Sequence, residues 1–281
     1  MTAETRIDRL TKVAAPLNYL VPSDVRPAAY TFEPPPGVPW RTGELRPQTV
    51  EIADGRPLAE RFSLDRQGFV LLNAPSVVTD FEDERTLKSV YFPEVERLVR
   101  EATGATRVIA FDHNLRSAPL AGAGRAKEPI KRAHNDFTEL SGPRRAADEL
   151  AAAGVDPAIL EGTRFALINL WRPVRRPVEE SPLAVCDARS MAPGDFVASD
   201  LIYRDRVGET YQVTHSPGHQ WFYFPKLRPD EAILIKCYDS ATDGTARFTA
   251  HAAFDDPTSP ANARPRESIE VRTLVLYGAV G

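Results

Sequence analysis

Residues 231–240, EAILIKCYDS, form a short apolar and β-branched run between polar ends, which is typical of a β-strand. Six further runs of this kind fill the C-terminal half, and turn residues separate each run from the next. They are RFALINLWRPV (164–174), SPLAVCDARSM (181–191), YQVTHS (211–216), HQWFYFPKL (219–227), RFTAHAAF (247–254) and ESIEVRTLVLY (267–277). Many short strands separated by turns favour a mainly β fold, an antiparallel sandwich or barrel such as a jelly roll.

The first half of the chain mixes helix and strand patterns. Apolar residues at helical spacing predict a helix over 91–105, in which Pro93 suits the first turn and Gly104 the end. A second helix is expected over 141–155, with Ser141 as a possible N-cap. Runs rich in β-branched and aromatic residues predict strands at 38–52, 62–72 and 107–116. The fold is therefore expected to be mainly β with flanking helices.

No repeat, low-complexity tract or clear linker divides the chain. A single domain over residues 1–281 is expected, because a β-rich unit can reach roughly 250 residues. Within it, residues 1–125 form a mixed α/β N-terminal portion, and residues 126–281 form the β-core that holds the functional site.

Composition excludes several classes of protein. The 35 Lys+Arg and 39 Asp+Glu residues give a formal net charge of −4, which argues against general nucleic-acid binding. No apolar run approaches the ~20 residues that span a bilayer, so no membrane partner is expected. The first 20 residues lack the apolar core of a signal peptide, and a cytoplasmic location is expected. Cys186 and Cys237 form no CxxC pair, so both are interpreted as buried apolar residues.

Among the 5 histidines, His134 is followed two residues later by Asp136, in the segment RAHNDFT. Residues i and i+2 of an extended segment project to the same side, so both side chains can reach one metal ion. A surface pair or a capping arrangement is the alternative interpretation of this short pattern.

Residues further along the chain favour a metal site. His251 lies in a late apolar run, and Arg266 and Ser268 begin the strand after it, again two residues apart. Two imidazoles and one carboxylate form the facial triad of non-haem iron(II) oxygenases. A guanidinium beside a hydroxyl suits the far carboxylate of a dicarboxylic cosubstrate. Alternatives stay open: His219 competes with His251 as the distal ligand, and Arg264 and Arg272 compete with Arg266.

Most of the chain, from about residue 68 to 277, resembles the iron(II)/2-oxoglutarate-dependent oxygenases. It is most similar to the hydroxylase/desaturase family that includes gibberellin-type desaturases and CmcJ-like proteins. The resemblance rests on HNDFT (134–138), INLWRPV (168–174), SPLAVCDARSM (181–191), HQWFYFPKL (219–227), DEAILIKCYDS (230–240), AHAAF (250–254) and RESIEVR (266–272). It implies a double-stranded β-helix core, with His134, Asp136 and His251 as iron ligands and Arg266 and Ser268 holding 2-oxoglutarate.

The activity implied by this resemblance uses Fe(II), 2-oxoglutarate and O2. Oxidative decarboxylation gives succinate, CO2 and an iron(IV)-oxo oxidant, which hydroxylates or desaturates an unactivated C–H bond of a small molecule from specialised or catabolic metabolism. The pattern does not name the substrate, the oligomeric state, or the choice among hydroxylation, desaturation, epoxidation and cyclisation. Two other interpretations are a cupin-like dioxygenase or lyase that does not use 2-oxoglutarate, and a non-catalytic β-barrel binding module.

Five residues are candidates for contact with the prime substrate. His219 and Tyr223 alternate with Trp221 along one strand face, which borders either the pocket or a core. The same choice applies to Asn169 and Trp171 in INLWRP. Lys236 lies in a run that should be buried, so it needs a partner, either a substrate or cosubstrate carboxylate or an internal salt bridge.

Overall fold

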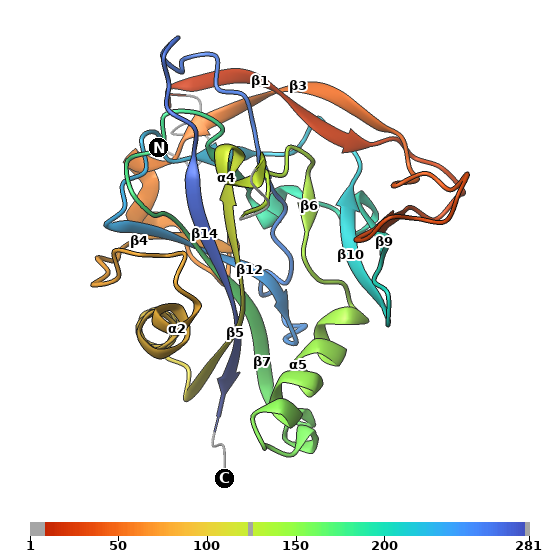
Figure 1. Ribbon diagram of the computed structural model, residues 1–281, viewed down its shortest axis with the longest axis vertical. Coiled ribbons are helices and arrows are strands. Elements are labelled where there is room, and N and C mark those ends of the chain that lie inside the picture. The colour runs from red at the N-terminus through yellow and green to blue at the C-terminus, as the bar shows by residue number, and fades with distance from the viewer. Residues whose placement is uncertain (1–8, 123–125, 279–281) are drawn as a thin grey trace.

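Two β-sheets face each other in the computed structural model, which describes residues 9–122 and 126–278 (Figure 1). The nine-stranded sheet has the order β1 (Lys12–Leu20), β3 (Leu45–Asp54), β11 (Trp221–Tyr223), β8 (Leu183–Cys186), β13 (His251–Ala253), β6 (His134–Asn135), β10 (Val207–Val213), β9 (Phe196–Ile202) and β2 (Ala28–Tyr30). The five-stranded sheet has the order β4 (Phe69–Asn73), β12 (Glu231–Asp239), β7 (Arg164–Pro173), β14 (Glu267–Tyr277) and β5 (Arg107–Ser117). The prediction of a mainly β fold is confirmed.

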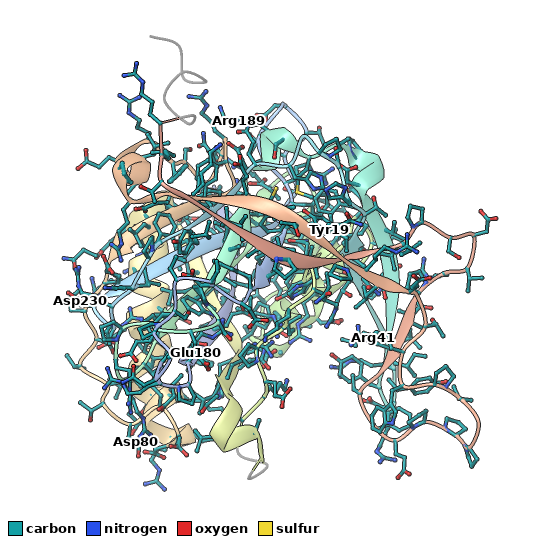
Figure 2. The ribbon with its side chains drawn as sticks, turned by 90° about the horizontal axis from the view of Figure 1, so that it is seen from above. Tyr19, Arg41, Asp80, Glu180, Arg189 and Asp230 are labelled. Carbon is teal, nitrogen blue, oxygen red and sulfur yellow. The ribbon has the colours of Figure 1, made fainter. Side chains whose placement is uncertain are left out.

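Strands from both halves of the chain build both sheets. β1 and β3 pair with each other and join the nine-stranded sheet through β11, whereas β4 and β5 form the two edges of the five-stranded sheet. Seen from above, β1 and β3 cross the top of the molecule, and Tyr19 of β1 lies on this side (Figure 2). The N-terminal portion is thus interleaved with the C-terminal strands in the same two sheets.

Alternating side chains place each sheet between two cores. Trp171 and Ile233, which are partners in the register of β7 and β12, belong to the cluster between the two sheets. Their neighbours Leu170 and Leu234 belong to a second cluster on the opposite face, which packs against helix α3 (Phe92–Thr103). A third cluster, which includes Trp221, covers the face of the nine-stranded sheet that is turned away from the other sheet. We call the facing sides of the two sheets the inner faces, and the opposite sides the outer faces.

Helix α3 has the predicted boundaries. Pro93 lies in its first turn, and Gly104 ends it with a φ of 67°, in the left-handed region that favours glycine. The second predicted helix is α5 (Ser141–Ala152). The prediction that Ser141 is its N-cap is wrong, because Ser141 is the first helical residue. The Thr138 hydroxyl instead accepts the backbone N–H groups of Leu140 and Ser141.

Two predicted strands are shorter than the pattern suggested. The strand predicted at 38–52 begins at Leu45, and the one predicted at 62–72 begins at Phe69. The backbone N–H groups of Gln67 and Gly68 both bond to the Ser63 carbonyl, and this turn occupies the residues before β4. The remaining short helical segments are η1 (Arg56–Arg61), α2 (Glu84–Thr86), η2 (Leu87–Tyr91), α4 (Ala118–Gly122), η3 (Pro157–Leu160), η4 (Ala188–Ser190) and η5 (Pro193–Asp195). Within the described ranges, each helix is too short or too polar to cross a membrane.

Candidate metal centre

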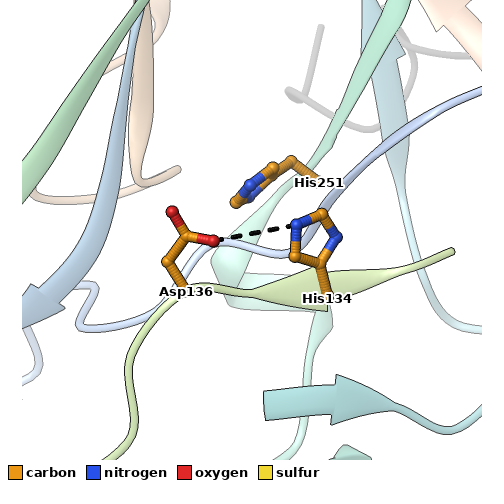
Figure 3. A group of neighbouring side chains, drawn as sticks. All are labelled: His134, Asp136 and His251. Atoms are coloured by element: carbon orange, nitrogen blue, oxygen red, sulfur yellow. Dashed lines mark ion pairs between the residues drawn. The ribbon is translucent and has the colours of Figure 1, made fainter. Parts of the chain in front are cut away.

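Three predicted ligands converge on the inner face of the nine-stranded sheet. His134 on β6 and His251 on β13 are register partners on neighbouring antiparallel strands, and their ring centroids are 4.4 Å apart. Asp136 follows β6 two residues after His134 and projects to the same side (Figure 3). One ligand atom from each of the three side chains lies within 4.8 Å of the others, so the three could hold one metal ion.

Both imidazoles have the tautomer that a metal ligand needs. Nδ1 of His134 lies 2.9 Å from the Arg132 carbonyl oxygen, and Nδ1 of His251 lies 3.1 Å from the Thr249 carbonyl oxygen. A carbonyl oxygen can only accept, so each Nδ1 carries the hydrogen and each Nε2 of a neutral ring keeps its lone pair. Burial, with the nearby His251 and Arg132, lowers the pKa of His134 well below its ordinary value, which keeps this ring neutral.

Asp136 is held by one oxygen and leaves the other free. Its Oδ2 accepts hydrogen bonds from Nε of Arg272 at 2.9 Å and from Nδ2 of Asn169 at 2.8 Å. Its Oδ1 lies 3.8 Å from Nε2 of His134, on the side of the histidines. Burial raises the pKa of Asp136, but Arg272 and the two histidines outweigh burial, so the net pKa lies well below its usual range. The carboxylate is therefore ionised and oriented to offer one oxygen to a metal.

Arg266 and Ser268 lie beside this centre with unused polar atoms. Arg266 lines the same cavity as His134 and His251, is 4% exposed, and has its Cζ atom 5.3 Å from the Trp171 ring centroid. Its Nη1 donates to the Ser181 carbonyl oxygen, but its Nε has no hydrogen-bond partner among the described residues. The buried Ser268 hydroxyl lacks a partner there too. Buried polar groups are rarely left unpaired, so these two atoms fit a ligand.

The donor set agrees with iron and a keto-diacid. Two neutral imidazoles and one carboxylate on one side of an ion leave positions for further ligands, as in non-haem iron(II) sites. The unpartnered donors of Arg266 and Ser268 then suit the far carboxylate of a keto-diacid that is bound to the metal at its other end.

Comparisons with known proteins agree with this geometry. Residues 17–276 match a family described as oxidoreductase/YMDC permease-like domain. Hydroxylase/desaturase efuI of Hormonema carpetanum is 34% identical over 254 residues, which cover 82% of this chain and 84% of that protein. Fe(II)/2-oxoglutarate-dependent dioxygenase nvfI of Aspergillus novofumigatus is 33% identical over 258 residues, covering 89% and 90%. The solved structure of the iron and alpha-ketoglutarate-dependent endoperoxidase NvfI superposes with a TM-score of 0.86 at 28% identity, covering 96% of this chain and 99% of that one.

This chain belongs to the iron(II)/2-oxoglutarate-dependent dioxygenases. The match over nearly its whole length confirms the predicted double-stranded β-helix core and the predicted dependence on Fe(II), 2-oxoglutarate and O2. The dioxygenase acts on a small molecule, as its hydroxylase/desaturase relatives indicate.

The competing residues of the dioxygenase are engaged with other partners. Arg264 is exposed and pairs with Glu179. Arg272 is committed to Asp136 and, through Nη1 at 2.7 Å, to Asp112. His219 is on the outer side of the nine-stranded sheet, where its Nε2 lies 3.1 Å from Asp195. Of the alternatives considered in the sequence, Arg266 and His251 are the ones that face the cavity.

The five substrate candidates separate by sheet face. Trp171 lines the cavity. Asn169 is on the same inner face, but its amide N–H group donates to Asp136 and does not point into the cavity as a free donor. Tyr223 belongs to the outer-face cluster with Trp221, so neither it nor His219 lines the cavity, and both expectations are corrected.

Lys236 also requires a correction. Its neighbour Ile235 pairs with Asn169 on the inner face, so alternation turns Lys236 to the outer face. There its Nζ lies 2.6 Å from Asp65 and 2.7 Å from Asp239, and the side chain is fully buried. Lys236 forms the internal salt bridge that the sequence left open as an alternative, and it does not reach a substrate or cosubstrate carboxylate in the cavity.

Sequence reasoning missed several residues that line the cavity, Arg116 among them, and the role of Arg272. Arg116 on β5 lines the cavity, as the register partner of Ser268. Arg272 shares strand parity with Arg266, which placed it among candidate carboxylate receptors, but its partner is the Asp136 carboxylate. Nothing in the segment around Arg116 marks it, because only the pairing of β5 with β14 brings it to the site.

Proposed function

We propose that this dioxygenase hydroxylates or desaturates an unactivated C–H bond of a small-molecule metabolite at the His134–Asp136–His251 centre. One observation carries the proposal: the ligand atoms of His134, Asp136 and His251 lie within 4.8 Å of one another, and both histidines line a cavity with Arg266, whose Nε has no partner among the described residues. Iron bound there with 2-oxoglutarate and dioxygen would supply the oxidant that cleaves the C–H bond.

The protein's own groups orient the metal ligands and keep water out of the site. The Arg132 and Thr249 carbonyls fix the imidazole tautomers, and Arg272 with Asn169 fixes the carboxylate. Arg266 and Ser268 would bind the distal carboxylate of 2-oxoglutarate, with Nε and the hydroxyl as donors. Trp171 packs against the Arg266 guanidinium and lines the cavity beside the two histidines. Buried walls keep water away from the reacting carbon.

The test is succinate formation with matched variants. Purified protein supplied with Fe(II), ascorbate and 2-oxoglutarate should form succinate, and a substrate should increase the rate. Arg266→Met should raise the KM for 2-oxoglutarate by about 10- to 100-fold, since a charge-assisted hydrogen bond contributes roughly 1.5–3 kcal/mol. His134→Ala and Asp136→Ala should lose metal binding, measured by calorimetry with Mn(II). Full metal affinity in either variant would contradict the proposed centre. An unchanged reaction in Arg266→Met would favour a metal enzyme that does not use 2-oxoglutarate.

A second reaction outcome has its own support. The structural relative with a TM-score of 0.86 is named an endoperoxidase. Incorporation of both atoms of labelled dioxygen into one product would favour endoperoxide formation here, whereas one labelled atom indicates hydroxylation and none indicates desaturation.

Two further proposals concern the domain organisation of the chain and its location in the cell. We propose a single domain, supported by the presence of N-terminal strands in both sheets, and a cytoplasmic protein without nucleic-acid partners, supported by the net charge of −4. Calorimetric unfolding should show one transition, and electrophoretic mobility of DNA should not change with added protein. Two separate transitions or a retarded DNA band would contradict these statements.

A further inference from the structure

A second buried arginine lies in the metal cavity. Arg116 is 9% exposed and lines the same space as His134, His251 and Arg266. Its Nη1 donates to the Glu128 carbonyl oxygen at 2.9 Å, which is a neutral acceptor. Within residues 9–122 and 126–278, no carboxylate lies within ion-pair distance of Arg116. A buried cation ordinarily has an anionic partner, so this guanidinium needs one.

The acids near the cavity are already engaged. Glu270 lines the cavity, but its carboxylate lies 3.6 Å from Arg272. Arg272 in turn holds Asp136 and Asp112. Among the described residues none of these carboxylates forms an ion pair with Arg116, although Glu270 lines the same cavity.

The cosubstrate does not supply enough charge either. Of the two carboxylates of 2-oxoglutarate, one belongs to the metal chelate and the other to Arg266 in the proposed function. Arg116 is then left as a second cation in the same cavity, with no ion-pair partner among the described residues and no carboxylate from 2-oxoglutarate.

Further cations crowd the same side. Nζ of Lys127 lies 2.5 Å from Oδ1 of Asn114, which is on β5 two residues before Arg116. Burial lowers the pKa of Arg266 to about 9, with a further lowering from the charge of Arg116. The pKa of Lys127, an exposed residue, is lowered by partial desolvation and by Arg116 and Arg272, whereas Asp112 and Glu270 oppose the shift. These cations repel one another, and an anion between them would relieve the repulsion.

We propose that Arg116, with Lys127 beside it, binds a carboxylate of the prime substrate, so that this dioxygenase acts on organic acids. The inference rests on the proposed function and adds a substrate class to it. The guanidinium offers Nε and Nη2 as a planar fork for the carboxylate, while Nη1 stays on Glu128. The same chemistry could instead come from the distal carboxylate of 2-oxoglutarate, shared between Arg116 and Arg266, and the first experiment separates the two sources.

The cosubstrate arm uses N-oxalylglycine, titrated by calorimetry into Mn(II)-loaded protein. Arg266→Met should weaken its binding by about 10- to 100-fold. Arg116→Met should change the affinity for N-oxalylglycine less than about threefold, because the carboxylate that Arg116 binds is not that of the cosubstrate. Equal losses in the two variants would overturn the proposal and assign Arg116 to 2-oxoglutarate. If the wild-type protein bound neither Mn(II) nor N-oxalylglycine, the proposed function itself would fail.

The substrate arm uses benzoate and its neutral counterpart benzamide as probes, with Mn(II) and N-oxalylglycine bound. Mn(II) enhances the relaxation of protons held close to it, so a saturable enhancement reports binding in the cavity. Benzoate should show it in the wild type and bind about 10- to 100-fold more weakly in Arg116→Met, and benzamide should show little. Arg116→Lys, which keeps the charge but not the fork, should lie between the two.

A surface-charge control isolates contact from long-range attraction. Lys131 is exposed and pairs with Asp255, in the same segment as the metal ligands. Lys131→Met should leave benzoate binding within about twofold of the wild type, because exposed charges are screened. The proposal is overturned if benzoate binds Arg116→Met as well as the wild type, if benzamide matches benzoate, if neither probe is enhanced in the wild type, or if Lys131→Met weakens binding as much as Arg116→Met.

Discussion

His251 and His219 are buried histidines near the strands of one sheet, yet their surroundings differ completely. On the inner face, His251 uses Nδ1 on a backbone carbonyl and keeps Nε2 for a ligand beside His134 and Asp136. On the outer side, His219 has both ring nitrogens engaged, Nε2 with Asp195 at 3.1 Å and Nδ1 with the Tyr19 hydroxyl at 3.3 Å. Residue type is the same in both places. What distinguishes the functional site is that ligand atoms of His134, Asp136 and His251 lie within 4.8 Å of one another.

The largest expected effect separates these two histidines directly. His251→Ala should abolish measurable Mn(II) binding, a loss greater than the roughly 100-fold that accompanies loss of a group that merely orients a ligand. His219→Ala should keep wild-type metal affinity, because it removes a side chain from the other side of the sheet. Calorimetric titration of both purified variants measures the contrast, and circular dichroism checks that each is folded. Metal binding that survived in His251→Ala and vanished in His219→Ala would reverse the assignment.

The five-stranded sheet allows the same comparison between its faces. Lys236→Met removes the cation that pairs with Asp65 and the fully buried Asp239. The free energy of unfolding should fall by at most about 3–5 kcal/mol, because the buried Asp239 carboxylate loses one of its two cationic partners. Arg164, which also bonds to Asp239, moderates the loss.

Urea denaturation of the metal-free protein measures this effect. Arg46→Met is the control, since Arg46 is exposed and pairs with the exposed Glu44, so its loss should cost less than about 1 kcal/mol. Binding of N-oxalylglycine to Mn(II)-loaded Lys236→Met should match the wild type below its unfolding transition. A loss of that binding in a folded variant would return Lys236 to the cavity.

A smaller effect is expected on the inner face of that sheet, at Asn169. Asn169→Ala removes the amide that donates to Oδ2 of Asp136, while Arg272 still holds this oxygen. Mn(II) affinity should drop by about 10- to 100-fold, as when a group that orients a metal ligand is lost.

The control variant for Asn169 is another buried amide. Gln67→Ala removes a side chain that accepts the Ser63 N–H, away from the three ligands. It should cost stability without changing metal affinity. Equal Mn(II) binding in wild type and Asn169→Ala would show that Arg272 alone positions the carboxylate.

Sequence patterns predicted what depends on local chemistry. Pro93 and Gly104 mark the ends of α3 because each favours one backbone conformation. The spacing of His134 and Asp136 sufficed because two residues in an extended segment share a side. The strand runs identified most of the C-terminal strands for the same reason, since alternation and β-branching act within a few residues.

The rest depends on contacts between distant segments. Sequence alternation groups His219, Trp221 and Tyr223 on one side of a strand but does not say which side turns inward. Arg116 reaches the cavity only because β5 pairs with β14 in one register, and the Thr138 hydroxyl caps α5 only after the chain has turned. The partners of Lys236 illustrate the same limit, because Asp65 is 171 residues away.

The smallest expected effect is a pH dependence on the outer side of the nine-stranded sheet. Burial lowers the pKa of His219 below its ordinary value of 6.5, although the Asp195 carboxylate opposes the shift, and His215 and Tyr19 are the other titratable neighbours. The unfolded chain then binds a proton at His219 more readily than the folded protein does. The contribution of His219 to stability is therefore full above pH 6.5 and declines as the pH falls toward the lower folded-state pKa.

His219→Gln should lose about 1 kcal/mol of stability at every pH, because it loses hydrogen bonds of the imidazole. Its unfolding free energy, measured with urea in the metal-free protein, should fall less between pH 8 and pH 5.5 than that of the wild type. His134 titrates in the same direction in both proteins, so its contribution cancels in the difference. Identical slopes would mean that His219 is as easily protonated in the fold as outside it, and the contrast between the hydrogen-bonded His219 and the ligand-ready His251 would lose its electrostatic support.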